Sequence, residues 1–222
     1  MLNEIIIALI ASFMTMDAVI FGQFGFSRPI VCGPIIGFIV GNPLAGLHIG
    51  AILELIWINT IPIGTTLVPD VTAATVIAVR WASYILSSSA PSPVTEGAAA
   101  AISMMIALPI SLIFRKMDLT QRIRASGYNL YLEEAVKNGR YNAVPVGRVI
   151  FLSSAEHYFR NFLLFLPAFY LERFLPPFVT GVVPPQALAG LNFGYWLLPA
   201  VGIGVFFYNF YDSVLKILLV KK

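Results

Sequence analysis

Residues 28–57 read RPIVCGPIIGFIVGNPLAGLHIGAILELIW, and this stretch decides how the chain folds. Its first apolar run, residues 29–41, is bounded by Pro29 and by Asn42-Pro43. A membrane-crossing helix needs about 20 apolar residues, so this run is too short to cross alone. We expect a re-entrant, tilted or broken helix, which a membrane tolerates only where protein or a cavity satisfies the backbone.

Small residues follow a helical period through the same stretch. Glycines recur every four residues, first at Gly33, Gly37 and Gly41 and then at Gly46 and Gly50. Positions four apart share a helix face, and small residues let membrane helices approach closely. Glu54 continues the second series, so we expect its carboxylate to face a neighbouring helix rather than lipid. There it either binds a ligand or is a structural acid bonded to that helix.

The remainder of the chain is also strongly apolar. Of its 222 residues, 58% are hydrophobic and only 11% are charged, with a mean hydropathy of +0.83. Hydrophobic runs lie at residues 5–22, 29–41, 44–61, 71–90, 97–114, 149–171 and 193–220. Because a soluble domain is typically about 25% charged, we predict an all-α, polytopic integral membrane protein with transmembrane helices plus broken or re-entrant helical segments.

We expect one membrane domain, residues 1–222, with three parts. Residues 1–114 hold the amino-terminal helices and the glycine-rich region, 115–148 form a cytoplasmic amphipathic segment, and 149–222 hold the carboxy-terminal helices. The amino terminus carries Glu4 and no basic residue before Arg28, so it is expected to be a retained membrane segment rather than a signal peptide.

Several kinds of chemistry are not indicated. The single cysteine, Cys32, rules out a disulfide within the chain and is expected to be a small buried hydrophobe. The sequence shows no nucleophile motif, phosphate-binding glycine loop or metal-ligand spacing. We therefore predict a protein that is not itself an enzyme and that uses no cofactor or metal. The net charge of +3 does not indicate nucleic-acid binding.

Charge predicts the orientation of the second half. Seven of the fourteen basic residues lie in the hydrophilic segment 115–148, which the positive-inside rule places in the cytoplasm. The lysine-bearing tail is expected there too, with the runs 149–171 and 193–220 as the two crossings between. Segment 115–148 either lies as a helix on the inner membrane surface or docks a soluble partner. Residues 174–192 hold two Pro-Pro pairs and are expected to form a loop or a broken, re-entrant element on the outer side.

Polar residues within these apolar runs are candidates to contact a small polar ligand. They are Glu54, Asp70, Asn59, Trp57, Asp17 and Gln23. A carboxylate in or near a bilayer usually marks a substrate or ion route. Trp57 lies three residues beyond Glu54, and an aromatic ring beside a carboxylate suits a sugar. Alternatively, Trp57 belongs to the aromatic belt at the membrane surface.

Asn59 and Asp70 flank a segment that cannot continue as a helix. Pro62, Gly64 and Pro69 interrupt it, and polar groups at helix breaks recur in transporter binding sites. Asp70 is also expected to cap the helix that follows.

Other polar residues have simpler interpretations. Asp17 and Gln23 either reach a polar cavity or lie at the membrane interface. Glu96 starts a hydrophobic run, as expected of an acid at a helix amino terminus. No chain of acids leads to His48, so a proton pump is not indicated. Arg80 either extends to the membrane surface or pairs with a buried acid.

An ordered set of short motifs resembles a known family. They are Phe26-Ser27-Arg28-Pro29, Gly41-Asn42-Pro43, Gly46, Ile49-Gly50, Leu53-Glu54, Ile63-Gly64 and Pro69-Asp70. In this order and spacing they resemble the IIC subunit of the mannose/fructose/sorbose family of the bacterial phosphoenolpyruvate-dependent sugar phosphotransferase system. The family's usual Gly-Asp is Gly41-Asn42 here, which removes a charge. The chain also ends soon after the 193–220 run, where family members usually have further hydrophobic sequence.

The resemblance implies a sugar permease subunit in a bacterial cytoplasmic membrane, acting with a related IID membrane subunit. Cytoplasmic IIA and IIB subunits would carry the phosphoryl group and phosphorylate the sugar on arrival. The resemblance also implies that Glu54 and Asp70 bind the substrate and, less directly, that Asp17 and Gln23 do. The alternatives are a non-transporting assembly or scaffold subunit, whose acids only hold helices together, and a solo ion-coupled sugar carrier.

Overall fold

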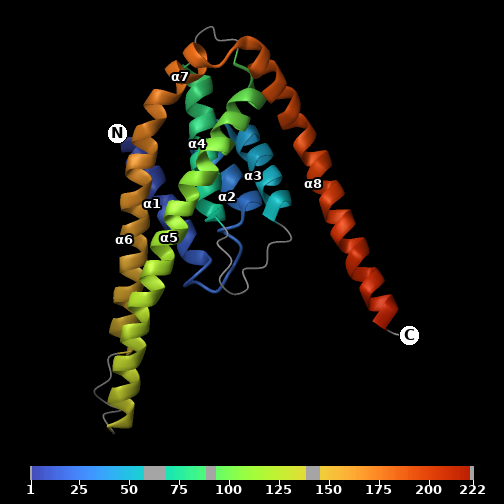
Figure 1. The fold of residues 1–222 in the computed structure, drawn as a ribbon. Helices are drawn as coiled ribbons and strands as arrows, with labels where there is room; N and C mark the ends of the chain where they lie inside the picture. The colour runs from blue at the N-terminus through green and yellow to red at the C-terminus, as the bar shows by residue number, and fades with distance from the viewer. Residues whose placement is uncertain (1, 58–68, 89–93, 139–145, 221–222) are drawn as a thin grey trace.

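The computed structural model describes residues 2–57, 69–88, 94–138 and 146–220, and every regular element in these ranges is a helix. The helices are α1 Leu2–Asp17, α2 Pro29–Ile39, α3 Pro43–Trp57, α4 Val71–Ser88, α5 Glu96–Lys137, α6 Val146–Leu171, α7 Leu175–Val182 and α8 Pro185–Val220. A short 3-10 turn, Glu172–Phe174, joins α6 to α7. Figure 1 shows α4, α5 and α6 running in alternate directions, with α8 diverging from the other helices toward its carboxy-terminal end. The predicted all-α class is confirmed.

Four stretches of helix in the described part are long and apolar enough to cross a membrane. They are Val71–Ser88, Glu96–Glu134, Val146–Val182 and Pro185–Tyr208. The chain is therefore a multi-pass membrane protein. By contrast, α2 has 11 residues and α3 has 15. At 1.5 Å per residue α2 is about 16 Å long, roughly half the thickness of a bilayer's hydrocarbon core. This confirms that the run starting at Pro29 cannot cross alone.

Glycines bring α2 and α3 into backbone contact. A Cβ added at Gly37 would lie 3.0 Å from Cα of Gly46 and 3.1 Å from Cα of Pro43. One added at Gly33 would overlap the carbonyl oxygen of Gly46 and lie 3.0 Å from Cα of Gly50. Gly33 and Gly37 therefore face Gly46 and Gly50 across the helix pair, and the close helix approach expected at small residues is confirmed.

The turn between α2 and α3 depends on one further glycine. Gly41 has a φ of +84°, a left-handed conformation that favours glycine, and it ends α2. Asn42 follows it; its amide donates to the carbonyl of Gly37 at 2.7 Å and its carbonyl accepts from Gly46 at 3.1 Å. Asn42 thus lies at the opposite end of α3 from Glu54, and its backbone joins the two helices.

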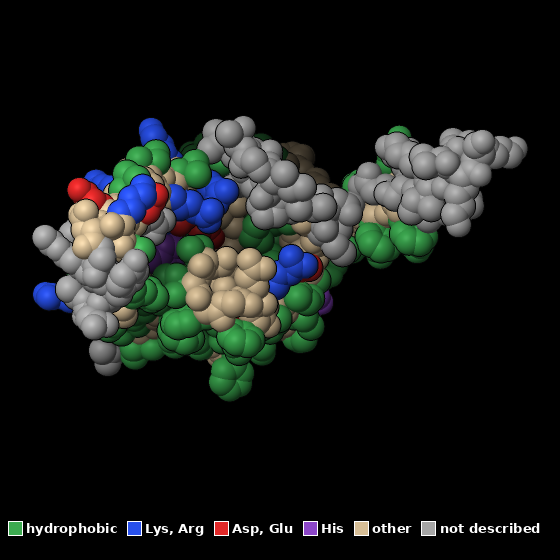
Figure 2. All heavy atoms as spheres, turned by 90° about the horizontal axis from the view of Figure 1, so that it is seen from below, with side chains coloured by type: hydrophobic (Ala, Val, Ile, Leu, Met, Phe, Trp, Pro, Cys, Tyr) green, Lys and Arg blue, Asp and Glu red, His purple; other side chains and the backbone are tan. Residues whose placement is uncertain are grey.

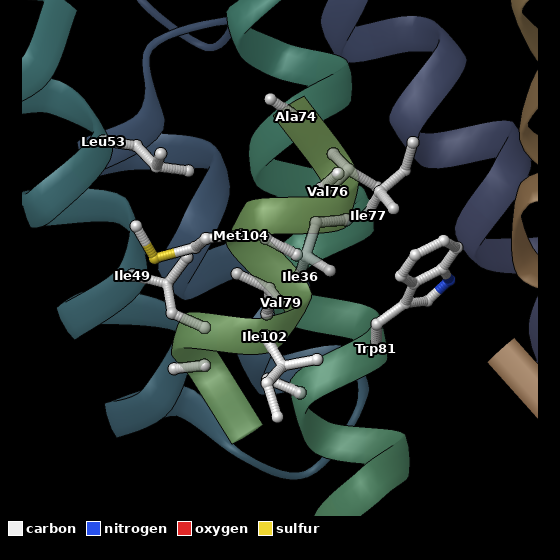
Figure 3. Close-up of a cluster of buried hydrophobic side chains, with 14 of the residues drawn as sticks. Ile36, Ile49, Leu53, Ala74, Val76, Ile77, Val79, Trp81, Ile102 and Met104 are labelled. Atoms are coloured by element: carbon white, nitrogen blue, oxygen red, sulfur yellow. The ribbon is translucent and has the colours of Figure 1, made fainter. Parts of the chain in front are cut away.

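The centre of the molecule is α4, whose residues from Thr72 to Val79 are all buried. A helix that is buried on nearly every face belongs inside a helical assembly. Figure 3 shows Val76 and Ile77 of α4 in the same buried hydrophobic cluster as Ile36 of α2, Leu53 of α3 and Met104 of α5. The short pair α2–α3 is therefore held against spanning helices, and Cys32 of α2 is buried as expected.

A buried ion pair joins α4 to the end of α6. Arg80 donates from Nη2 and Nε to the two carboxylate oxygens of Glu172, at 2.6 and 2.9 Å, and Glu172 is fully buried. Of the two alternatives for Arg80, pairing with a buried acid is the correct one. Trp81 adds a second link, because its indole N–H donates to the carbonyl of Ala168 at 3.0 Å.

Two sequence predictions about connecting segments need correction. A separate helix on the membrane surface over residues 115–148 is wrong for the described residues, because 115–137 continue α5 in line with its apolar half (Figure 1). The loop expected at 174–192 is also wrong in part. Residues 175–182 form α7, and α8 starts at Pro185, where a missing amide hydrogen costs no helical bond. The alternative prediction, a broken element, agrees with the structure, but the break is confined to Val183 and Pro184.

Figure 1 shows the lower end of α5, the start of α6 and the carboxy-terminal end of α8 on the same side of the molecule. This agrees with the predicted pair of crossings after residue 148. Glu96 is the first residue of α5, as expected, and the hydroxyl of Thr95 accepts from the amide of Ala98 at 3.4 Å to cap the helix.

Candidate functional site

Polar side chains gather where four helix ends meet: the end of α1, the start of α2, the end of α3 and the start of α4. Hydrogen bonds or ion pairs link the four ends in three steps, Asp17 to Ser27, Arg28 to Glu54, and Thr72 to Ser27. We call this group the helix-end cluster. It lies at the open end of the short α2–α3 pair, where helices stop inside the membrane domain and leave backbone groups available.

Asp17 organises the segment that joins α1 to α2. Its carboxylate accepts hydrogen bonds from the backbone amides of Phe24, Gly25 and Ser27 at 2.8, 2.9 and 3.2 Å, and from the Ser27 hydroxyl at 3.2 Å. The segment turns sharply, and Gln23 itself has a φ of +63°. Asp17 is buried, so its observed role is to fix this turn.

Gln23 lies exposed on that turn, and its backbone amide donates to the carbonyl of Asp17 at 3.1 Å. The structure therefore brings Asp17 and Gln23 close together through the backbone.

Glu54 is the acid that crosses from one helix to another. Its Oε1 lies 2.7 Å from Nη2 of Arg28, and its Oε2 accepts from the amide of Ile30 at 3.4 Å. Arg28 is the N-cap residue of α2, but its side chain makes no capping hydrogen bond. Glu54 places a negative charge at this end of the helix, where the helix dipole is positive. The Glu54 side chain is 15% exposed and that of Arg28 is 58% exposed. The pair is thus open on the arginine side.

Asp70 caps α4, as predicted. Its Oδ1 accepts from the amide of Ala73 at 2.8 Å, and its own amide donates to the carbonyl of Ser111 on α5 at 3.3 Å. Next to it, the hydroxyl of Thr72 donates to the carbonyl of Ser27 at 2.9 Å. Asp70 and Thr72 therefore fix the start of α4 against α5 and against the turn that precedes Arg28.

Of the remaining two candidates, Trp57 and Asn59, the structure describes only Trp57. Trp57 ends α3 and is only 9% exposed, within the buried hydrophobic cluster. Asn59 lies outside the described residues. The sequence did not indicate that Arg28 pairs with Glu54. The place of Arg28 one residue before Pro29, at the start of a short helix, was the available signal.

The helix-end cluster combines hydrogen-bond donors with acceptors. An arginine and a carboxylate side by side offer both donors and acceptors, which suits a ligand rich in hydroxyl groups. Among the residues that the structure describes, no group of three His, Cys, Asp or Glu side chains is arranged to hold a metal ion.

Comparison with known proteins places this fold. The family described as the PTS system sorbose-specific IIC component matches residues 1–218. The PTS system mannose-specific EIIC component of Escherichia coli K12 is 23% identical over 143 residues, covering 64% of this chain and 49% of that protein. The fructose permease IIC component of Bacillus subtilis 168 is 30% identical over 111 residues, covering 50% of this chain and 39% of that protein. These alignments thus span about half or less of the relatives' lengths.

One solved structure, a complex of the mannose transporter ManYZ with microcin E492, is similar over 100% of this chain and 96% of the matched chain. Its TM-score is 0.55 at 17% sequence identity, so the likeness concerns the fold. The family match covers nearly all of the sequence and agrees with the motifs between Phe26 and Asp70. The chain therefore belongs to the family of sorbose-specific IIC components of the sugar phosphotransferase system.

Proposed function

We propose that this chain is a permease subunit that binds a sugar and carries it across the bacterial cytoplasmic membrane, where partner subunits phosphorylate it. Membership of the IIC family supports the proposal, as do the relatives named for mannose and fructose. The observation that carries it is the position of Glu54. Its carboxylate lies at the open end of a helix pair too short to span the membrane, beside an exposed arginine.

In this proposal Glu54 and Arg28 contact the sugar hydroxyls directly. Carboxylate and guanidinium groups bind hydroxyls well, and helix breaks at membrane depth are used by transporters to expose such groups. Asn59 and Trp57 would complete the contact surface, as the sequence suggested. Asp17, Gln23 and Asp70 would act from behind it, because Asp17 and Asp70 already bond backbone amides that position Arg28 and α4.

We also propose the partners that this function needs. A IID-like membrane subunit would complete the permease, in line with the ManYZ complex that shares this fold. Cytoplasmic IIA and IIB subunits would supply the phosphoryl group, since this chain is proposed to have no phosphoryl-transfer residue of its own.

A second candidate function rests on the same ion pair. Because Glu54 already bonds Arg28 and the amide of Ile30, its role is alternatively structural, in an assembly subunit that does not transport. The two functions differ in what Glu54→Gln should do. A ligand carboxylate should be needed for uptake, whereas a structural one should be needed for stability.

The test is phosphoenolpyruvate-dependent uptake of labelled hexoses, ketoses and amino sugars into vesicles. The vesicles would hold this chain with candidate IIA, IIB and IID subunits. Wild type, Glu54→Gln and the control Glu133→Gln would be compared, because Glu133 is 59% exposed and pairs with Lys137 on the same helix, α5. Thermal unfolding of each variant would be measured in parallel.

Uptake that delivers sugar phosphate, is lost in Glu54→Gln and is kept in Glu133→Gln would support the proposal. Normal uptake by Glu54→Gln would remove Glu54 from the site. Uptake of unmodified sugar without phosphoenolpyruvate would indicate a solo carrier. A stable complex that takes up no sugar, with Glu54→Gln lowering only its Tm, would favour the assembly subunit.

A further inference from the structure

A second polar region lies between α5, at residues 117–124, and the middle of α6, at residues 156–164. A hollow of about 440 Å³ opens there on the surface. Its lining combines two chemistries. Phe159 and Leu163 are apolar and more than half exposed, while Arg124, Glu156 and Arg160 are charged. We call it the α5–α6 hollow.

The charged groups around the hollow do not balance. Four arginines, Arg115, Arg122, Arg124 and Arg160, lie in ion-pair range of two carboxylates, Asp118 and Glu156. Asp118 is shared by three of them, with its oxygens 3.0 to 3.6 Å from their nitrogens. The arginines of this set outnumber its carboxylates by two, and the carboxylate of Asp70, which also interacts with Arg115 and Arg160, lowers the positive excess to one. A site with such an excess attracts an anion.

Arg160 is held rigidly at the inner wall of the hollow. Its Nη1 donates to the carbonyl of Met117 at 3.2 Å and to the side chain of Gln121, and its Nη2 lies 2.9 Å from Nδ1 of His157. Its Nη2 also donates to Oδ1 of Asn161 at 3.4 Å and its Nε is buried, so the guanidinium is fixed in place and contributes its positive charge to the wall. A fixed guanidinium is a better anion receptor than a free one because less side-chain entropy is lost on binding.

Arg124 forms the outer wall and is the movable group. Its side chain is 71% exposed, and its Nη1 lies 3.6 Å from Glu156, beyond ordinary hydrogen-bond distance. It is therefore free to turn toward a bound anion.

The orientation predicted from the sequence places the hollow toward the cytoplasmic edge of the membrane. The apolar half of α5 ends near residue 114, and the basic residues that follow were predicted to be cytoplasmic. Figure 2, seen from this end, shows Lys and Arg side chains gathered on the side of the molecule occupied by the ends of α5 and α6, with hydrophobic side chains beside them. Phosphate groups of a bilayer lie at this boundary, and the acyl chains lie next to them.

We propose that the α5–α6 hollow binds one anionic phospholipid of the cytoplasmic leaflet. Arg124 binds its phosphodiester, the fixed positive charge of Arg160 attracts it, and Phe159 and Leu163 contact its acyl chains. Charged and apolar walls side by side fit a lipid better than a soluble anion, which would leave the apolar wall uncovered. The two walls also fit a lipid better than a protein loop, because a loop would not need both the excess positive charge and the exposed apolar side chains of Phe159 and Leu163.

The test is native mass spectrometry of the full chain in detergent, keeping any subunit that copurifies. Phosphatidylglycerol and phosphatidylcholine with the same acyl chains are added in competition. Arg124→Gln is compared with Arg148→Gln, since Arg148 is also an exposed arginine on the cytoplasmic half of α6 but does not line the hollow. Phe159→Ala is compared with Phe151→Ala, a phenylalanine of α6 that is 71% exposed and does not line it either.

Wild type should retain phosphatidylglycerol over phosphatidylcholine. Arg124→Gln should reduce that preference about fivefold, the usual worth of one basic residue at an anionic membrane surface, and Arg148→Gln should leave it unchanged. Phe159→Ala should weaken binding of both lipids, and Phe151→Ala should not.

Three results would overturn the proposal. They are equal retention of the two lipids by wild type, equal losses in the two arginine variants, and displacement of phosphatidylglycerol by millimolar glycerol phosphate, which would indicate a site for a soluble anion. A copurifying subunit that blocks the hollow and abolishes the preference would equally refute it, and would assign the hollow to a protein contact.

Discussion

Replacing Gly46 by alanine should force α2 away from α3 and destabilise the protein. The new Cβ would overlap the carbonyl oxygen of Gly33 and lie 2.9 Å from Cα of Gly37. Non-bonded carbons are normally 3.5–4.0 Å apart, so the helices must separate by roughly 0.6–1.1 Å. Both obstacles are backbone atoms, which cannot rotate away as a side chain would.

The size of the effect follows from that geometry. Overpacking usually costs about 1–3 kcal/mol, and a clash with backbone belongs at the upper end, about 3 kcal/mol. For a chain of this size each kcal/mol lowers Tm by about 2–4 °C, so Gly46→Ala should lower it by about 6–12 °C. The Arg28–Glu54 ion pair should be lost as well, because it connects the same two helices.

Thermal unfolding in detergent measures this, with Gly127→Ala as the matched control. Gly127 is also a helical glycine, but nothing lies within 4 Å of a Cβ added there. Alanine at that site should stabilise the helix by about 0.5–1 kcal/mol. If Gly46→Ala unfolds within a degree of wild type, or if Gly127→Ala is lowered equally, the close helix contact is not what holds α2 to α3.

Three further substitutions test other contacts. Glu172→Leu should cost about 3–5 kcal/mol by leaving Arg80 buried without its partner, and adding Arg80→Met should restore most of the lost Tm; no recovery in the double variant would contradict this. Asp17→Asn replaces one acceptor oxygen among four hydrogen bonds, so limited proteolysis within residues 18–27 should become faster, and unchanged cleavage would argue against the anchoring role. Thr72→Val removes the bond to Ser27 and should lower Tm by about 2–4 °C; an unchanged Tm would show that this bond contributes nothing.

The fold class could be predicted because it depends on local sequence. Apolar runs of spanning length report membrane helices directly, since every backbone polar group in lipid must be satisfied within the helix. The short helix beginning at Pro29 and the close helix contact at glycines four residues apart could be predicted in the same way. The ends of helices were predicted less accurately. Residues 115–137 look hydrophilic, yet they extend α5, because a helix continues past its apolar part when nothing breaks it.

The candidate site could be predicted only in part. The position of Glu54 on the glycine face indicated that it faces a neighbouring helix, and Asp70 was correctly expected to cap α4. The partner of Glu54 could not be predicted from the sequence. Arg28 lies 26 positions earlier in the chain and reaches Glu54 only once α2 packs against α3. The contacts of Asn59 and Trp57 with a sugar stay predictions.

The sequence by itself determined that this chain is a multi-pass helical membrane protein of the IIC family, with a glycine-rich run at residues 29–41 that is too short to cross alone. Those properties follow from hydropathy, helical period and residue size, which act over one or two turns. Only the tertiary structure decided the pairing of charges. Arg80 meets Glu172 from 92 positions away, and Arg160 joins Asp118 from a different helix. Such pairs depend on how helices pack, because in the low-dielectric interior each buried charge is stable only beside the partner that packing brings to it.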